Sequence, residues 1–234
     1  MIEGKTKKLH GSWAPGNKKP ALLEFSDRIT AGNKERSSEF ILKGQYCNGI
    51  SGMLMQRLNL LGICTHFSYW DPEKANAQWV TPLEMYPIEV VVRNWAAGSF
   101  CKRYNKPPGI LHKPIVEYFI KNDDMGDPQI PVNHISFLEP LLNVEQLEYT
   151  SLRINGILLG IFGMINLRLV DIKPEFGMKD CKLTLGDEIS PDTMRLWEME
   201  GCKCYDKDIF RKDGSNPVVQ YQYVYDLLRT CMVR

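Results

Sequence analysis

The stretch from residue 169 to residue 197 constrains the fold more than any other part of the chain. Asp171, Lys173 and Glu175 stand two residues apart in a segment that is typical of a β-strand. Alternate residues of a strand project from the same face of the sheet, so these three side chains are expected to share one side. The stretch therefore predicts a strand that gathers two carboxylates and one ammonium group.

The same stretch continues as a hairpin, with a turn expected at residues 177–180 and a second strand over residues 181–187. Asp187 continues the apolar face of that second strand, where a carboxylate needs something to compensate its charge. Magnesium held by Glu175 and Asp187 would do so, because hard oxygen ligands suit this ion. The alternative is a hairpin with solvated charges and one salt bridge to Lys173, which contributes little to stability.

Size and composition describe a globular protein of 234 residues, with 44% hydrophobic and 24% charged residues. This length allows one large domain or two small ones that share a cleft. The net charge of +1 gives no general electrostatic case for a nucleic acid or membrane partner. Residues 1–11 lack the apolar run of a signal peptide, and the seven cysteines are interpreted as reduced thiols. These features predict a cytoplasmic protein.

Helical spacing of apolar residues predicts a helix over residues 44–61 and a closing helix over residues 220–232. A longer helix is expected over residues 143–165, with an asparagine cap at its start. Ser190 is expected to cap a short helix that carries Arg195. Glycines inside the long helix predict close packing on a sheet: Gly156, Gly160 and Gly163.

Shorter segments read as strands and loops. Residues 21–25 form an apolar strand, residues 27–34 read as a loop, and residues 106–114 read as a second loop rich in proline and glycine. Two strand-like runs occupy residues 79–92, and residues 83–85 between them resemble a linker that joins a small N-terminal lobe to a larger C-terminal lobe.

Two segments offer cationic groups for phosphate. A β-branched strand ends at Arg93 and is followed by a turn with Ser99, which suits a phosphate grip; the alternative is an arginine paired to a nearby carboxylate such as Glu89. Near the N-terminus, Lys5 and Lys7 follow a glycine and either lie over phosphates or are ordinary exposed lysines.

Taken together, the segments resemble the phosphoribosylaminoimidazole-succinocarboxamide synthase (SAICAR synthetase) family. The matching motifs occur in the family's order and cover nearly the whole chain: EGKTKKLH, LEFSDRITAGN, LGICTHF, MYPIEVVVRNWAAGSFCKRY, IKNDDMGDP, LVDIKPEFG, LGDEISPDTMRLW and YDKDIFR. The resemblance implies an α+β fold with two lobes, a β-rich N-terminal lobe over residues 1–84 and an α/β C-terminal lobe over residues 85–234, with an ATP cleft between them.

The resemblance also implies an activity, namely a carbon–nitrogen ligase of de novo purine biosynthesis. It would join L-aspartate to the carboxylate of carboxyaminoimidazole ribotide (CAIR), with ATP and Mg²⁺ as cofactors, to give SAICAR, ADP and phosphate. An acyl phosphate is the expected intermediate, because a carboxylate is a poor electrophile until it is activated. The family commonly forms homodimers.

Site residues follow from the resemblance motif by motif. Magnesium would be held by Glu175 and Asp187. The nucleotide phosphates would meet Lys5, Lys7 and Lys121, and the adenine would meet the backbone of Met85. The ribotide phosphate side would be held by Arg93, Ser99 and Arg195, with Asp171 nearby. Lys173 would lie between the reacting groups, and Lys207 and Arg211 would belong to a segment that closes over the site, with Asp208 orienting them.

One departure from the family pattern bears on the fold. Pro174 stands where an aliphatic residue is usual, and proline lacks a backbone donor, so the strand should lie at an edge or lose one rung there.

Two other functions fit the same residues. A small-molecule kinase would leave phosphate on its acceptor, and a non-catalytic protein would bind ATP without turnover.

Overall fold

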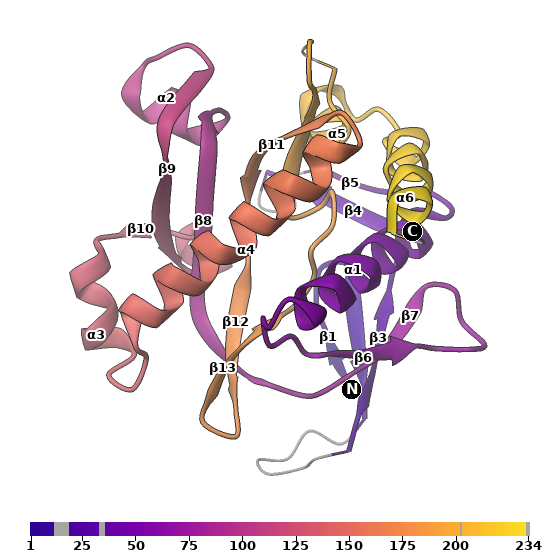
Figure 1. The fold of residues 1–234 in the computed structure, drawn as a ribbon, viewed down its shortest axis with the longest axis horizontal. Helices are drawn as coiled ribbons and strands as arrows, with labels where there is room; N and C mark the ends of the chain where they lie inside the picture. Colours follow the sequence, from indigo (N-terminus) through magenta and orange to yellow (C-terminus); the bar gives the residue numbers. More distant parts are fainter. Residues whose placement is uncertain (12–18, 33–35, 202, 233–234) are drawn as a thin grey trace.

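The computed structural model describes residues 1–11, 19–32, 36–201 and 203–232 (Figure 1). Its helices are α1 (Lys43–Leu60), α2 (Ser99–Tyr104), α3 (Ile135–Leu138), α4 (Val144–Met164), α5 (Asp208–Asp213) and α6 (Val218–Met232), with short 3₁₀ turns at Asp123–Met125 and Val132–His134. Its first strands are β1 (Ile2–Glu3), β2 (Lys7–His10), β3 (Ala21–Phe25), β4 (Arg28–Ala31), β5 (Arg36–Glu39), β6 (Phe67–Trp70) and β7 (Ala77–Val80). The later strands are β8 (Glu84–Ala96), β9 (Gly109–Ile120), β10 (Gln129–Ile130), β11 (Leu167–Ile172), β12 (Glu175–Lys179), β13 (Lys182–Gly186) and β14 (Met194–Glu198).

Within the described residues, the strands form two main sheets and one separate hairpin. The first sheet has the order β1-β2-β3-β7-β6, and β4 pairs only with β5. The second sheet has the order β10-β9-β8-β11-β14, with β12 pairing β8 and β13. Mixed helices and strands with mainly antiparallel pairing confirm the expected α+β class.

The long strand β8 is the frame of the second sheet. It pairs with β9 along most of its length on one side, and with both β11 and β12 on the other side. Pro174 lies between β11 and β12, where the predicted continuous strand is broken, so the expected loss of a rung is confirmed. Lys173 consequently lies in the break and not within a strand with Asp171 and Glu175.

Helices cover these sheets with their apolar sides. Ile50 and Leu54 of α1 join one buried cluster with Val90 of β8 and with Leu158 and Phe162 of α4. Helix α1 also contacts the first sheet and α6, as the ribbon shows on the right of Figure 1. The main core therefore takes side chains from both sides of residue 84. None of the described helices combines the length and apolar character required to cross a bilayer.

The three long helices agree with the expectations from spacing. Helix α1 ends at Leu60 and is followed by Gly62 in a left-handed conformation with φ of 79°. In α4 the side chain of Asn143 accepts a hydrogen bond from the backbone N–H of Gln146 at 2.9 Å, as expected of an N-cap. Helix α6 covers the predicted closing segment and begins two residues earlier.

The glycines of α4 contradict the expected close packing. A side chain added at any of them would meet open space, and all three lie on the exposed side of the helix: Gly156, Gly160 and Gly163. The close approaches occur elsewhere. A Cβ at Gly44 of α1 would lie 2.4 Å from the carbonyl oxygen of Phe25, and one at Gly177 of β12 would lie 2.7 Å from that of Glu84.

The short helix expected after Ser190 is also wrong. Residues 190–193 form one turn, in which the hydroxyl of Ser190 accepts a hydrogen bond from the backbone N–H of Asp192 at 3.1 Å. The chain then enters β14, where Met194 and Leu196 are buried in alternation with Arg195. Arg195 thus lies on a strand beside β11.

Turn and loop boundaries shift in four further places. The hairpin turn falls at Asp180 and Cys181, both with positive φ, because a two-residue loop of this kind matches strand twist. Strand β9 begins inside the loop expected at residues 106–114, and β4 replaces part of the loop expected at residues 27–34, of which residues 33 and 34 lie outside the described part. The expected linker at residues 83–85 runs into β8.

The open surroundings of Gly156 allow a test of the helix packing. We expect Gly156→Ala to raise the free energy of unfolding by about 1 kcal/mol, because alanine has the higher helix propensity and nothing obstructs its methyl group. Gly44→Ala is the matched control, since the same substitution forces a methyl group against a carbonyl and should destabilise. Chemical denaturation of both variants measures the effect, and a destabilised Gly156→Ala variant would contradict the exposed position.

Candidate active site

A cavity of about 670 Å³ collects residues from distant parts of the chain. Segments near the N-terminus form part of its wall, at residues 4–7 and 30–32. Residues of the second sheet, the turn after β13 and the α5 region complete it: Glu89, Lys121, Asp123, Lys173, Glu175, Asp187, Glu188, Asp192, Thr193, Lys207 and Arg211. Of the residues expected in the site, the cavity brings together Lys5, Lys7, Lys121, Lys173, Glu175, Asp187, Lys207 and Arg211.

The β12–β13 hairpin supplies the two carboxylates of the expected metal pair. Glu175 is paired in register with Gly186, so Asp187 follows directly after the residue opposite Glu175. Asp187 does not continue β13 as expected, because its φ of 53° turns the chain there. Burial by itself raises the pKa of Asp187, but the ammonium groups of Lys7 and Lys121 outweigh it and lower the pKa to about 2.

Lysine side chains form ion pairs with both of these carboxylates and with the neighbouring Glu188. The ammonium of Lys7 lies 2.7 Å from Asp187 and 2.5 Å from Glu188, and Lys121 is ion-paired with Glu175. Burial alone would lower the pKa of Lys7, but the two carboxylates raise it above the usual range. Lys7 and Asp187 therefore both remain charged inside the cavity.

Lys173 and Lys5 make corresponding pairs at the edges of the cavity. Lys173 contacts Glu89 at 2.5 Å and Glu175 at 3.5 Å, so the salt bridge expected of this hairpin includes a carboxylate of β8 as well. Lys5 is ion-paired with Asp123, which lies in the acidic turn after β9. The N-terminal strands and the second sheet thus contribute opposite charges to the same cavity.

Lys207 differs from these cations. Within the described residues, no carboxylate lies within the 4.0 Å that defines an ion pair with its ammonium. Burial lowers the pKa of Lys207, although Asp192 opposes this effect. Lys207 therefore offers the cavity a positive charge that an anionic ligand can meet directly.

The expected ribotide residues lie beside the cavity wall in a continuous series of ion pairs. Arg195 contacts Asp171 at 2.7 Å and Asp208 at 2.8 Å, and Asp208 contacts Arg211 at 2.5 Å. Burial alone would lower the pKa of Arg195, but Asp171 and Asp208 raise it further above its normal range. Asp208 therefore orients both arginines, which links Arg195 to the cavity.

Arg93 continues the series into the interior. It is 3% exposed and contacts Glu117 at 2.5 Å and Asp171 at 3.1 Å. The structure thus shows the alternative of an arginine paired to nearby carboxylates, with Glu117 and Asp171 as the partners in place of Glu89. Ser99 begins α2 directly after Gly98, and a Cβ at Gly98 would lie 2.5 Å from the guanidinium of Arg195.

Met85 lies at the start of β8, opposite Gly177 of β12. Its side chain is 39% exposed and covers Gly186, since a Cβ at that glycine would lie 2.8 Å from the Met85 sulfur. Met85 is therefore next to the hairpin that carries Asp187, although it is outside the group of residues that line the cavity.

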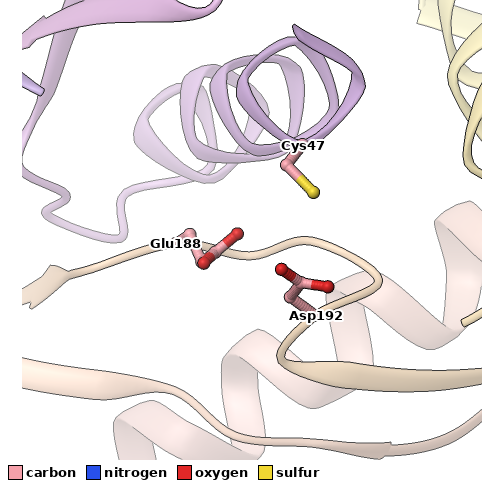
Figure 2. A group of neighbouring side chains, drawn as sticks. All are labelled: Cys47, Glu188 and Asp192. Atoms are coloured by element: carbon pink, nitrogen blue, oxygen red, sulfur yellow. The ribbon is translucent and has the colours of Figure 1, made fainter. Parts of the chain in front are cut away.

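Three side chains that sequence reasoning did not select converge at the cavity wall: Glu188 and Asp192, which line the cavity, and Cys47 (Figure 2). Their ligand atoms all lie within 4.8 Å of one another. Burial raises the pKa of the Cys47 thiol well above its usual value, so the sulfur stays protonated and is a poor metal ligand. The only sequence signal was the acidic residue next to Asp187.

Lysines already supply positive charge to this buried group. Lys43, which is 1% exposed, lies 2.6 Å from Asp192, and Lys7 pairs with Glu188. The hydroxyl of Tyr221 donates a hydrogen bond to Asp192 at 2.7 Å. This network joins α1, α6 and the turn before β14, and so fixes the wall that carries Glu188 and Asp192.

The cavity brings lysine side chains and carboxylates together, an arrangement that suits an enzyme acting on anionic small molecules. Comparison with known proteins identifies the family. A model of the SAICAR synthetase family matches residues 1–227. The phosphoribosylaminoimidazole-succinocarboxamide synthase of Wolbachia pipientis is 44% identical over 206 residues, which cover 86% of this chain and 85% of that protein.

Solved structures agree with this match. The enzyme of the same name from Ehrlichia chaffeensis superposes with a TM-score of 0.91 at 37% identity, covering 98% of both chains. A SAICAR synthetase in complex with ADP gives a TM-score of 0.91 at 35% identity, covering 98% of this chain and 97% of that chain. The chain therefore belongs to the SAICAR synthetase family, as the sequence motifs predicted.

His66 provides a test of the electrostatics behind Asp187. It is 6% exposed, and burial lowers its pKa from 6.5 to about 4, although Asp187 opposes the shift. Between these pH values the unfolded chain binds a proton that the folded chain does not, so stability is lost as the pH falls. We expect this group to cost roughly 3 kcal/mol of stability on acidification from pH 7 to pH 4.

The measurement is the free energy of unfolding as a function of pH for the wild type and for His66→Gln. The wild type should lose stability more steeply with falling pH, by at most about 1.4 kcal/mol per pH unit, because only it gains a proton at this position on unfolding. Parallel pH profiles for the two proteins would show that the ring titrates alike in the folded and unfolded chains.

Proposed function

We propose that the chain joins L-aspartate to the carboxylate of CAIR at this cavity and forms SAICAR, ADP and phosphate. Membership of the SAICAR synthetase family makes it an ATP-dependent ligase of purine biosynthesis. The observation that carries the assignment of the site is the meeting of Glu175 and Asp187 with several lysines in one cavity. Such a site neutralises two anionic substrates that otherwise repel each other.

The reaction proceeds in two balanced steps. A carboxylate oxygen of CAIR attacks the γ-phosphorus of ATP, the bond to the bridging oxygen breaks, and ADP leaves with that electron pair. The aspartate amine then attacks the acyl carbon, the C–O bond to phosphate breaks with its electron pair leaving on phosphate, and the amine proton passes to the departing phosphate. Lys173 lies between Glu89 and Glu175 and is the group proposed to stabilise the reacting oxygens.

The cavity also fits magnesium. Glu175 and Asp187 offer hard carboxylate oxygens, and lysine ammonium groups now supply the positive charge that an ion would supply. Bound there, magnesium would neutralise the ATP phosphates and favour phosphoryl transfer. Lys7 and Lys121 would then turn from the carboxylates to the phosphates, together with Lys5.

The remaining roles follow from position. Arg195, whose guanidinium lies beside Gly98, and Ser99, the residue after that glycine, would hold the ribotide phosphate, and Arg93 would support Arg195 through Asp171. Arg211 of α5 and Lys207, the residue before that helix, would contact the reacting anions. Met85 would meet the adenine at the boundary between an N-terminal lobe of residues 1–84 and a C-terminal lobe of residues 85–234. We further propose a homodimer that acts in the cytoplasm.

Release of phosphate tests the reaction directly. We expect the purified protein to release phosphate when ATP, Mg²⁺, CAIR and L-aspartate are all present, in step with formation of SAICAR. Omitting L-aspartate should reduce multiple turnovers to a background rate, because the acyl phosphate has no amine to accept it. A chain that transfers phosphate to an acceptor and retains it there would be a kinase, and the proposed function would be wrong.

Asp187→Asn tests the metal role of the carboxylate pair. We expect kcat to fall by about a hundredfold or more, and the Mg²⁺ concentration for half-maximal rate to rise, because an amide oxygen carries no charge. Asparagine tolerates the positive φ at this position, so the fold should persist.

Asp180→Asn is the matched control. Asp180 lies in the same hairpin with a φ of 48°, is exposed, and is absent from the residues that line the cavity. Its kinetic constants and Mg²⁺ dependence should match the wild type. Near-normal turnover by Asp187→Asn with an unchanged Mg²⁺ dependence would remove Asp187 from the metal site.

A further inference from the structure

Helix α5 and the residue before it carry side chains that line the cavity. A carboxylate holds the start of the helix, and a guanidinium holds its end. Lys207 precedes the helix and Arg211 lies within it, and both line the cavity. At its start, the carboxylate of Asp206 accepts hydrogen bonds from the backbone N–H groups of Asp208 and Leu196 at 2.7 and 2.8 Å. The start of α5 is therefore fastened to β14.

The other end of α5 is held by Arg36 of β5. Its guanidinium donates hydrogen bonds to the carbonyl oxygens of Phe210 and Arg211 at 3.1 and 3.3 Å. The carbonyl of Phe210 also accepts a hydrogen bond from the backbone N–H of Gly214 at 2.9 Å. The last carbonyls of a helix lack partners within the helix, so an arginine suits the partial negative charge at this end. The arginine stem also lies close to Gly214, where a Cβ would be 3.7 Å from Arg36 Cδ.

An aromatic contact strengthens the same connection. Phe40, directly after β5, packs edge-on against Phe210 with ring centroids 6.0 Å apart, and Phe210 is fully buried. The β4–β5 hairpin itself pairs with no other strand in the described part of the chain. Thr30 and Ala31 of β4 line the cavity together with Lys207 and Arg211.

We infer that Arg36 is a positioning residue, which holds α5 so that Lys207 and Arg211 face the cavity. Arg36 does not line the cavity, so it acts through the carbonyls of α5 and not on a substrate. It also connects the β4–β5 hairpin to α5, and both of these elements contribute residues to the lining of the cavity. The inference rests on the proposed roles of Lys207 and Arg211 in the ligase reaction.

Arg36→Ala is the direct test. Water can replace the lost hydrogen bonds at this exposed position, so the melting temperature should change by less than about 3 °C. The value of kcat/KM for L-aspartate and CAIR should fall by about tenfold, because small displacements of catalytic groups are costly. Arg36→Lys keeps a cation with fewer donors and should recover part of the loss.

Arg153→Ala is the matched control. Arg153 of α4 is exposed and donates to the carbonyl oxygen of Leu61 at the end of α1, at 3.2 Å. The substitution removes the same kind of contact at a helix end that does not border the cavity, and should leave the kinetics unchanged. Hydrogen exchange of the amides in residues 208–214 should become faster in Arg36→Ala and not in Arg153→Ala.

Lys207→Met, assayed in parallel, separates the inference from the proposed function. If it loses activity while Arg36→Ala keeps wild-type kcat/KM, the positioning role is wrong. If neither variant loses activity, the proposed site is wrong and the inference fails with it. If Arg36→Ala unfolds, Arg36 has a role in stability alone. The same conclusion follows if Arg36→Lys is fully active and Arg36→Ala turns over no more slowly than the wild type.

Discussion

Neutralisation of charge inside one cavity is the constraint on which the site depends. An ionised group taken out of water costs several kcal/mol unless a counter-charge and hydrogen bonds compensate it. Here Lys7 compensates Asp187 and Glu188, and Lys121 compensates Glu175. The side chains are therefore held in place before any substrate arrives. In the proposed reaction, an incoming phosphate would replace a carboxylate as the partner of a lysine and would not have to create an ionic site.

Strand β8 makes this arrangement rigid. Because it pairs with β9 on one side and with β11 and β12 on the other, it brings three separate stretches of charged residues to one surface. Glu89 of β8 itself holds Lys173. Lys173 lies in the break beside β8 and Asp187 in the turn after β13, so the paired strands fix the points from which these charged side chains project.

The sequence predicts those features that depend on neighbours along the chain. Helix α4 has a long apolar period and an asparagine cap, and both signals act within a few residues. The strand that carries Arg195 was missed because a serine followed by proline imitates a helix start, whereas the alternation of buried residues in β14 arises from pairing with β11. In that segment, pairing with a distant strand determines the structure, and the local signal for a helix cap does not.

The candidate site shows the same difference between features that depend on local sequence and features that depend on long-range contacts. The spacing in the hairpin was enough to bring Glu175 and Asp187 under consideration, but it could not supply their partners, since Lys7 is 180 residues from Asp187 in the chain. The group of Cys47, Glu188 and Asp192 likewise joins α1 to the turn before β14. Sequence patterns say nothing about such contacts, because no local period links residues this far apart.

Arg195 and Asp208 connect the two halves of the proposed reaction. Asp208 forms ion pairs with both Arg195 and Arg211. Its carboxylate therefore neutralises part of the charge on Arg195, which is proposed to hold the ribotide phosphate, and on Arg211, which lines the cavity. A phosphate that approaches Arg195 competes with Asp208 for the same guanidinium donors. The carboxylate would then turn more fully to Arg211, on the helix that Arg36 holds from its other end. If Arg195 holds the ribotide phosphate as proposed, binding of the ribotide and placement of α5 would depend on the same ion pair.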